Sequence, residues 1–262
     1  MIWKRLYDLL KTGRDIPAIH SNGGTLSRGD LLALVSETAA HLPFPGQAGP
    51  NRVLLFDLPS LNLLVNILAC WNRGLVPVLL REGQNEQSIN DICRVLTPVA
   101  TVNHSGITYL DCNEIGSETP DFLPQDEALI ICTSGTTSIP KLVALTAQSQ
   151  LINAREIGAR LGLKVGDVVA VPTPLTYMYG LMGGSISALL AGAAIRLFSP
   201  STPASEIQAA IRREGITVIQ GPPSFLRLFL AYWNSTPFDS VRVVTTRDEK
   251  LGHPARPSVS SS

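Results

Sequence analysis

Residues 128–145 read Ala-Leu-Ile-Ile-Cys-Thr-Ser-Gly-Thr-Thr-Ser-Ile-Pro-Lys-Leu-Val-Ala-Leu, with a hydroxyl-rich segment between two apolar runs. The runs at 128–132 and 142–145 are short and rich in Ile, Leu and Val, so they predict two buried strands joined by a tight polar loop. The loop, residues 133–141, brings hydroxyl and backbone N–H groups together and ends in Lys141. These groups are the chemistry of a phosphate-binding loop.

An ordinary hairpin turn that is rich in Ser and Thr is the alternative interpretation. The segment is not a Walker A motif: Gly135 lies six residues before Lys141, but Pro140 occupies the position of the second glycine. Spacing alone therefore leaves phosphate binding and a plain turn both open.

The order of residues in this loop resembles a known family. Thr133-Ser134-Gly135-Thr136-Thr137-Ser138-Ile139-Pro140-Lys141 is similar to the signature Thr-Ser-Gly-Ser/Thr-Thr-Gly-x-Pro-Lys of the AMP-forming adenylating enzymes, and eight of the nine positions agree, counting the free one. That superfamily contains acyl- and aryl-CoA ligases, peptide-synthetase adenylation domains and luciferases. The departure is Ser138, where the family normally has glycine; a positive φ there would strain serine by about 1 kcal/mol or more.

Two later segments extend the resemblance. Residues 174–180, Pro-Leu-Thr-Tyr-Met-Tyr-Gly, are similar to the family's Pro-Leu-x-His/aromatic-x-x-Gly segment, which implies that Tyr177 lies beside the substrate carboxylate. The alternative is a loop bounded by proline in which Tyr177 and Tyr179 simply pack. Residues 221–224, Gly-Pro-Pro-Ser, resemble a segment that borders the acyl pocket, although Gly-Pro is also common in turns.

The resemblance implies an activity and a set of site residues. In the family a carboxylic acid attacks ATP, with Mg²⁺, to give acyl-AMP and pyrophosphate, and the thiol of CoA or of a carrier protein's phosphopantetheine then displaces AMP. Lys141 would be the catalytic residue of this chain. The residues implied in nucleotide binding are Thr133, Ser134, Gly135, Thr136, Thr137, Ser138 and Lys141. Those implied in binding a small carboxylic acid are Tyr177, Gly180, Gly221 and Pro222.

Strands and helices are expected to alternate along the chain, which predicts an α/β fold with layered, largely parallel sheets covered by helices. The expected strands are 51–57, 75–80, 99–103, 107–110, 128–132, 142–145, 167–171, 194–198, 216–219 and 241–245. The expected helices are an opening helix within 1–10, then 60–72, 86–96, 147–161, 180–191, 203–214 and 223–233. Thr146 is the expected N-cap of helix 147–161, and Pro203 and Gly215 are start and stop signals for helix 203–214.

The end of the chain departs from the family. Residues 1–246 are expected to form an incomplete N-terminal AMP-binding domain, with an approximate division into 1–126 and 127–246, and residues 247–262 to form a disordered Pro/Ser tail. The family's Tyr-Gly-x-Thr-Glu and Thr-Gly-Asp segments and its small C-terminal domain with a lysine are absent. We therefore expect a truncated or frameshifted ligase, or one completed by another C-terminal polypeptide, that is poorly active alone.

Two alternatives belong to other classes of function. One is a non-catalytic module or pseudoenzyme remnant that binds nucleotide or acyl groups without turnover. The other is an unrelated hydrolase with Ser134 as nucleophile, but the chain has no Gly-x-Ser-x-Gly elbow and its histidines show no spacing that nominates a base.

Composition excludes several partners and fits a cytoplasmic enzyme. The 262 residues carry 21 basic and 21 acidic side chains without long runs of either sign, which argues against nucleic acid and against an anionic membrane surface. Residues 168–195 carry no charge, but prolines and glycines interrupt them, which argues against a membrane span. The N-terminus lacks the continuous apolar core of a signal peptide. The scattered cysteines, Cys70, Cys93, Cys112 and Cys132, are expected to be buried free thiols.

Overall fold

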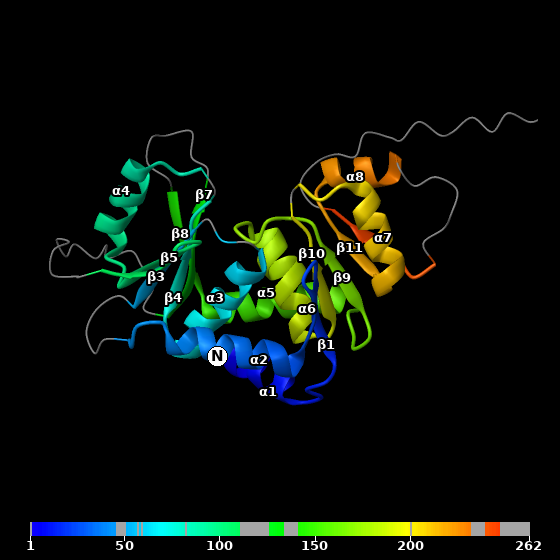
Figure 1. Ribbon diagram of the computed structural model, residues 1–262, viewed down its shortest axis with the longest axis horizontal. Helices are drawn as coiled ribbons and strands as arrows, with labels where there is room; N and C mark the ends of the chain where they lie inside the picture. Colours follow the sequence, from blue (N-terminus) through cyan, green and yellow to red (C-terminus); the bar gives the residue numbers. More distant parts are fainter. Residues whose placement is uncertain are drawn as a thin grey trace, which may run out of the picture.

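The computed structural model describes residues 2–45, 51–56, 58, 60–81, 83–110, 126–133, 141–199, 201–231 and 239–246. Within these residues the chain forms two six-stranded sheets with helices between them and on their outer faces (Figure 1). The expected α/β fold, with largely parallel strands covered by helices, is confirmed.

The first sheet has the strand order β6-β5-β3-β4-β7-β8. Its strands are β3 (Arg52–Leu55), β4 (Val76–Leu79), β5 (Ala100–Asn103), β6 (Gly106–Tyr109), β7 (Glu127–Thr133) and β8 (Lys141–Thr146). The four central strands are parallel to one another, and the two edge strands, β6 and β8, run antiparallel to their neighbours. The loop that connects β7 to β8 is therefore the loop of an antiparallel hairpin.

The second sheet has the order β12-β11-β9-β10-β1-β2. Its strands are β1 (Pro17–Ser21), β2 (Gly24–Ser27), β9 (Val168–Val171), β10 (Ala194–Leu197), β11 (Val218–Gln220) and β12 (Val243–Thr245). All neighbours are parallel except β1 and β2. The pairing of β1 with β10 brings the start of the chain into a sheet that otherwise belongs to its second half.

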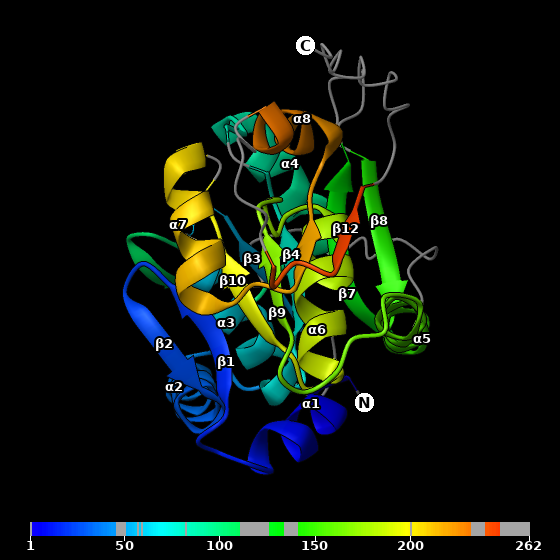
Figure 2. The same cartoon turned by 90° about the vertical axis from the view of Figure 1, so that its right-hand side faces the viewer.

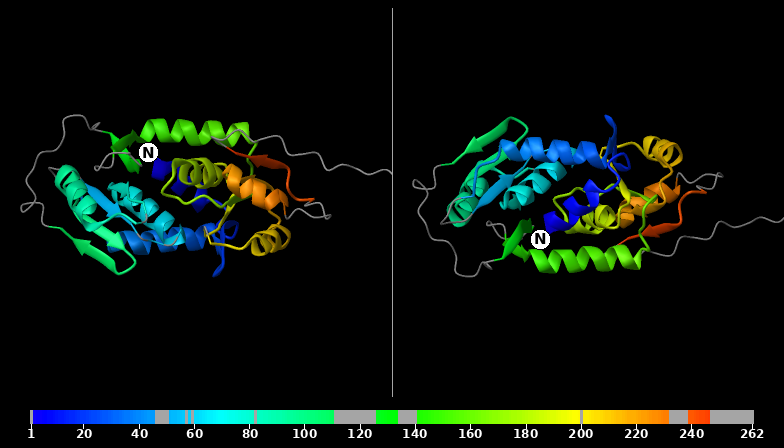
Figure 3. Two further views of the ribbon diagram at one scale, coloured as in Figure 1. Left: turned by 90° about the horizontal axis from the view of Figure 1, so that it is seen from above. Right: turned by 90° about the horizontal axis from the view of Figure 1, so that it is seen from below.

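The helices complete a five-layer arrangement (Figures 1 and 3). The helices between the sheets are α1 (Ile2–Lys11), α2 (Arg28–Ala40), α3 (Ser60–Arg73), α5 (Ala147–Arg160), η1 (Tyr179–Ile186) and α6 (Ser187–Leu190). Helix α4 (Glu86–Leu96) covers the outer face of the first sheet, while α7 (Ala204–Glu214) and α8 (Pro223–Ala231) cover that of the second. Seen from above, α2 and α5 lie on opposite flanks of the central layer (Figure 3).

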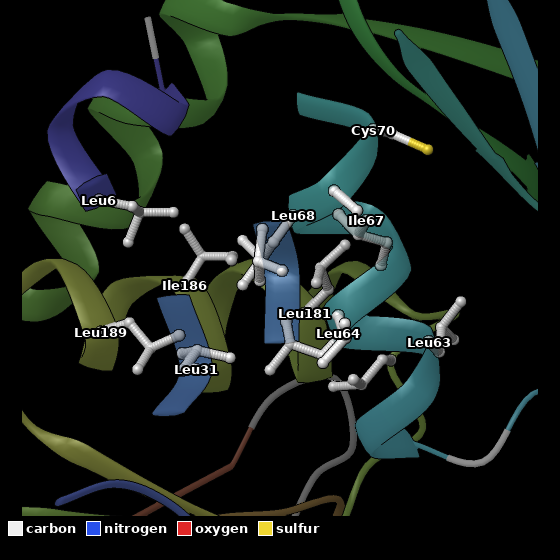
Figure 4. Close-up of a cluster of buried hydrophobic side chains, with 14 of the residues drawn as sticks. Leu6, Leu31, Leu63, Leu64, Ile67, Leu68, Cys70, Leu181, Ile186 and Leu189 are labelled. Carbon is white, nitrogen blue, oxygen red and sulfur yellow. The ribbon is translucent and has the colours of Figure 1, made fainter. Parts of the chain in front are cut away.

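The strands alternate their side chains between two cores because successive residues of a strand point to opposite faces. In β3, Val53 and Leu55 join the central core, whereas Leu54 joins the cluster under α4. In β9, Val169 and Val171 face the centre and Val168 and Ala170 face α7 and α8. In the central layer, leucines and isoleucines from α1, α2, α3, η1 and α6 point toward one another (Figure 4).

Several end signals of the helices are confirmed. Helix α4 spans the expected residues 86–96, and the hydroxyl of Thr146 accepts a hydrogen bond from the Ser149 backbone N–H at the start of α5. Pro203 is the N-cap of α7, and Gly215 ends that helix in the left-handed conformation, with φ of 63°. Threonine suits the first position because its hydroxyl pairs with an otherwise unpaired backbone N–H, and glycine suits the last because it tolerates positive φ.

Two expectations about local structure were wrong. Strand β8 is not buried: Val143 is 38% exposed, because β8 is an edge strand that pairs only with β7 (Figure 2). The expected helix 180–191 is π-helical from Tyr179 to Ile186 before it becomes α6. In that segment the hydroxyl of Ser185 donates to the carbonyl oxygen of Gly180, five residues earlier, over 3.1 Å, and side-chain bonds of this kind compete with a regular helix.

The expected division of the domain at residue 126 stays a prediction about folding units. The strand order crosses that position, because β4 and β7 are paired neighbours in one sheet, and the side chains of Arg52 and Glu127 form a buried ion pair at 2.6 Å. The tail at 247–262 lies outside the described residues.

The cysteine and membrane expectations can be followed over the described part of the chain. Cys70, Cys93 and Cys132 are free thiols, and Cys70 and Cys132 are buried; Cys112 lies outside the described residues. The described helices include none with both the length and the apolar character that a membrane span requires.

Candidate functional site

The residues singled out from the sequence follow the carboxyl ends of parallel strands. Lys141 closes the loop after β7, Tyr177 and Gly180 come after β9, and Gly221 and Pro222 come directly after β11. Ligands of open α/β sheets bind outside the carboxyl ends of the strands, where loops and helix starts face a common space. This edge of the molecule is therefore the candidate site.

The β7–β8 hairpin fixes both ends of the signature loop. Its register pairs Cys132 with Leu142 and Thr133 with Lys141, so the loop leaves and re-enters the sheet at directly opposed positions. Residues 134–140, which include Ser134, Gly135, Thr136, Thr137 and Ser138, lie outside the described residues, as does the side chain of Thr133. Lys141 itself is exposed at the start of β8.

Arg81 is a site residue that the sequence did not reveal. It directly follows Leu80, whose backbone N–H still bonds to the carbonyl of Leu55, so the strand holds its position. Because β4 is the neighbour of β7, Arg81 emerges beside the root of the hairpin loop. Its guanidinium carbon lies 4.5 Å from the centroid of the Tyr177 ring, and Tyr177 remains 44% exposed. This contact joins the carboxyl edge of the first sheet to that of the second.

The positive charge of Arg81 affects the pKa of the Cys132 thiol. Burial raises the pKa of Cys132 to about 12, and the positive charge of Arg81 opposes that rise. The cation therefore acts on the last residue before Thr133. A thiol with such a pKa stays protonated at neutral pH and is inert as a nucleophile.

The loop between β9 and η1 leaves no room for a side chain at Gly180. A Cβ on Gly180 would lie 2.6 Å from the carbonyl oxygen of Thr173 and 2.7 Å from that of Pro174. The same loop is closed by a hydrogen bond from the Tyr177 N–H to the Pro174 carbonyl at 3.1 Å. Glycine at 180 thus lets the helix start against the loop that carries Tyr177.

The carbonyl of Thr245, at the end of β12, accepts hydrogen bonds from the segment after β9 and from the segment after β11. It accepts a hydrogen bond from the Tyr179 hydroxyl at 3.2 Å and another from the Gly221 N–H at 3.2 Å. A Cβ on Gly221 would lie 2.6 Å from a ring carbon of Phe225. Tyr179 is therefore a packing residue, as the alternative interpretation of this segment held, whereas Tyr177 presents an exposed ring.

Several of the buried polar side-chain atoms that lack a hydrogen-bond partner lie at this edge. Within the described part of the chain such buried atoms include Arg81 Nε, Gln84 Oε1, Thr173 Oγ1, Gln220 Oε1 and Thr246 Oγ1. Buried polar atoms in folded proteins are nearly always paired, so donors and acceptors left over at one edge fit a polar ligand. Arg81, Thr173 and Thr246 supply N–H or O–H donors, which suit an anion.

The described residues contain no group of three or more His, Cys, Asp or Glu side chains placed to hold a metal ion.

Comparison with known proteins identifies the family. The model of the AMP-binding enzymes matches residues 8–260, so the chain belongs to the AMP-binding enzyme family. The chain is 28% identical over 261 residues to the nonribosomal peptide synthetase malG of Malbranchea aurantiaca, covering 92% of this chain and 11% of the synthetase. It is 31% identical over 132 residues to the mitochondrial medium-chain acyl-CoA ligase ACSF2 of Mus musculus, covering 48% of this chain and 21% of the ligase.

A solved structure supports the fold. The o-succinylbenzoate CoA synthetase (MenE) from Bacillus subtilis, in complex with the acyl-adenylate intermediate OSB-AMP, matches 95% of this chain and 68% of that chain with a TM-score of 0.77 and 19% identity. This structure confirms the expected fold, and the family model confirms the family that the signature loop implied. The chain spans only a minor part of the two curated relatives.

Proposed function

We propose that this chain binds ATP at the β7–β8 hairpin and takes part in the activation of a small carboxylic acid as its acyl adenylate. The observation that carries the proposal is the meeting of three elements at one edge: the opposed ends of the signature loop, the cation of Arg81 and the exposed ring of Tyr177. Family membership supplies the class of reaction.

The hairpin would hold the phosphates. Thr133, Ser134, Thr136, Thr137 and Lys141 would donate to the β- and γ-phosphate oxygens, with Gly135 and Ser138 shaping the loop. Each hydrogen bond to a charged group contributes about 1.5–3 kcal/mol. Lys141 is assigned the catalytic role because its ammonium would neutralise charge on the pyrophosphate as it leaves.

The acid would lie on the side of the second sheet. Tyr177, Gly180, Gly221 and Pro222 follow β9 and β11, and the ring of Tyr177 reaches Arg81 at the edge of the first sheet. A carboxylate oxygen of the acid would attack the α-phosphorus of ATP, the bond from that phosphorus to the bridging oxygen would break, and pyrophosphate would leave with the electron pair. Because both reactants are anions, positioning and charge neutralisation dominate this step.

The acceptor of the acyl group is proposed to be a thiol, either CoA or the phosphopantetheine of a carrier protein. The similarity to a nonribosomal peptide synthetase and to an acyl-CoA ligase supports both acceptors equally. Mg²⁺ would accompany ATP; among the described residues no group of three or more His, Cys, Asp or Glu side chains is placed to hold it. A polypeptide that supplies further family segments is a proposed partner.

Two measurements on the purified chain test the proposal. Titration calorimetry with ATP should show saturable binding, and ATP–pyrophosphate exchange by the chain alone should be slow but dependent on one member of a panel of aliphatic and aromatic acids. ATP binding without exchange would favour the second candidate, a nucleotide-binding module without turnover, for which Ser138 in place of the usual glycine is the motivating departure. Absence of ATP binding would contradict both candidates.

A further inference from the structure

Arg81 has a role that neither the signature loop nor the family model assigns. It lies on the short connection between β4 and α4, and that connection is fixed at both ends. At one end Leu80 is hydrogen-bonded into the sheet, and at the other the side chain of Asn85 caps α4 by accepting from the Ser88 N–H at 2.8 Å. The position of Arg81 relative to the hairpin is therefore set by the sheet and not by a long free loop.

The ring of Tyr177 orients the guanidinium. A cation within about 6 Å of a tyrosine ring is attracted by the negative charge density of the ring face. The 4.5 Å separation meets that condition. The Nε atom is buried and makes no hydrogen bond within the described part of the chain.

The charge of Arg81 acts on both halves of the proposed reaction. On one side it reaches Cys132, directly before the phosphate loop, and on the other it contacts Tyr177, which borders the proposed acid site. A planar guanidinium binds carboxylate or phosphate oxygens in pairs and keeps its charge at any pH at which the protein is folded. Arg81 is therefore suited to bind an oxyanion that lies between the proposed phosphate site and the proposed acid site.

We propose that Arg81 binds an oxyanion of the bound substrates, with Tyr177 as the positioning residue that holds the guanidinium in place. The inference rests on the proposed function, which puts two anions at this edge. Arg81 would transfer no proton; it would reduce the repulsion between the carboxylate and the α-phosphate as the new P–O bond forms. Loss of one such preorganised donor typically lowers the rate by about 10²- to 10³-fold.

A purely structural contact is the competing explanation, because Arg81 and Tyr177 also connect the two sheets. The two explanations differ in what an anion does to Arg81. A ligand-binding guanidinium changes the environment of its Nε–H when an anion arrives, whereas a structural contact does not.

The test is a ¹H–¹⁵N spectrum of the arginine side chains of the full chain. The Arg81 Nε–H signal is assigned by its loss in Arg81→Lys, and pyrophosphate, AMP and acetate are titrated separately. We expect the signal to shift saturably with at least one of them: pyrophosphate or AMP identifies a phosphate, and acetate identifies a carboxylate. Arg81→Met should weaken binding of that same anion at least tenfold in calorimetry, and Tyr177→Leu should weaken it by a smaller factor.

Arg94→Met is the matched control, since Arg94 lies on the neighbouring helix α4 with its side chain 72% exposed. It should leave anion affinity unchanged. An Arg81 signal that stays fixed in all three titrations, with Arg81→Met binding ATP as tightly as wild type, would overturn the role of Arg81 while leaving the proposed function intact. Conversely, the Arg81 Nε–H signal could shift with pyrophosphate or AMP in a chain that fails to bind ATP. That result would support anion binding by Arg81 and contradict the proposed function.

Discussion

Replacing Arg242 by leucine should weaken the attachment of β12 to the rest of the second sheet. The guanidinium of Arg242 forms a two-pronged contact with Asp167, from Nε to Oδ1 at 3.1 Å and from Nη2 to Oδ2 at 2.6 Å. It also donates to the carbonyls of Leu161 at 3.0 Å and Gly162 at 2.9 Å, at the end of α5. These contacts of Arg242 are called the Arg242 clamp. Because β12 also carries the Thr245 carbonyl that accepts a hydrogen bond from Tyr179, the clamp stabilises a strand that borders the candidate site.

The size of the effect follows from the burial of the two partners. The Asp167 side chain is 3% exposed, and removing one partner of a buried ion pair costs about 3–5 kcal/mol because the other charge stays buried. The Arg242 side chain is 34% exposed, so water screens part of the interaction, and we lower the expected loss to about 2–3 kcal/mol. Arg5→Leu, an exposed change on α1, should alter the stability by less than about 0.5 kcal/mol.

The clamp should also depend on pH. Burial raises the pKa of Asp167, but hydrogen bonds from Arg242, Thr217 and the Lys164 N–H outweigh it, so the pKa lies below its usual range. A carboxyl group with a lowered pKa in the folded state stabilises above its unfolded pKa, about 3.9, and loses that contribution as the pH falls through the folded value. The difference between wild type and Arg242→Leu should therefore be complete at pH 6 and shrink below about pH 4.

Urea denaturation of wild type, Arg242→Leu, Asp167→Asn and the double variant measures these quantities. The double-mutant cycle should give a coupling energy above about 1 kcal/mol at pH 6, since the two residues are in direct contact. A loss below 0.5 kcal/mol for Arg242→Leu, or additive effects of the two changes, would refute the reasoning from burial and geometry.

Three further predictions concern the candidate site and its surroundings. Gly180→Ala should lower the free energy of unfolding by about 1–3 kcal/mol in urea denaturation, because the new Cβ would meet two carbonyl oxygens. Gly23→Ala is the control and should be nearly neutral, since its Cβ would lie 3.7 Å from the nearest atom. Equal effects of the two changes would show that the loop adapts. At pH 8, iodoacetamide should leave Cys132 and Cys70 unmodified in the folded chain and alkylate them after unfolding, as mapped by mass spectrometry, because burial raises both pKa values; rapid labelling of the folded chain would contradict this. Ser138→Gly should tighten ATP binding in calorimetry if the loop requires a positive φ there, and an unchanged Kd would show that serine fits without strain.

Local signals predicted much of the fold. The limits of α4, the N-cap Thr146 and the glycine that ends α7 are set by residues within one or two turns, so the sequence alone could place them. The β1–β2–α2 unit also carried local signals, Asn22-Gly23-Gly24 for the hairpin and the Ser27–Asp30 capping box for α2, which our sequence analysis did not use.

Other features depend on the order of strands and could not be predicted locally. Arg81 enters the site only because β4 lies beside β7, and β1 joins the second sheet only because it pairs with β10 across a long stretch of chain. The π-helical turn depends on side-chain bonds from Ser185 and Ser187 to backbone carbonyls, which helix propensities do not capture. The residue types of the loop were enough to predict phosphate binding from the sequence. The residues that lie beside the loop, such as Arg81, could be identified only from the strand order of the structure.

Calorimetric titration of ATP into wild type, Lys141→Ala and Lys164→Ala addresses the nucleotide site most directly. Lys164 is an exposed lysine before β9, at the opposite end of the strands from the hairpin, so its removal changes the net charge equally without touching the loop. We predict that Lys141→Ala weakens ATP binding by about ten- to a hundredfold, the value of one charged hydrogen bond, while Lys164→Ala binds as wild type. Equal affinities for all three proteins would contradict the assignment of residues 133–141 to phosphate binding.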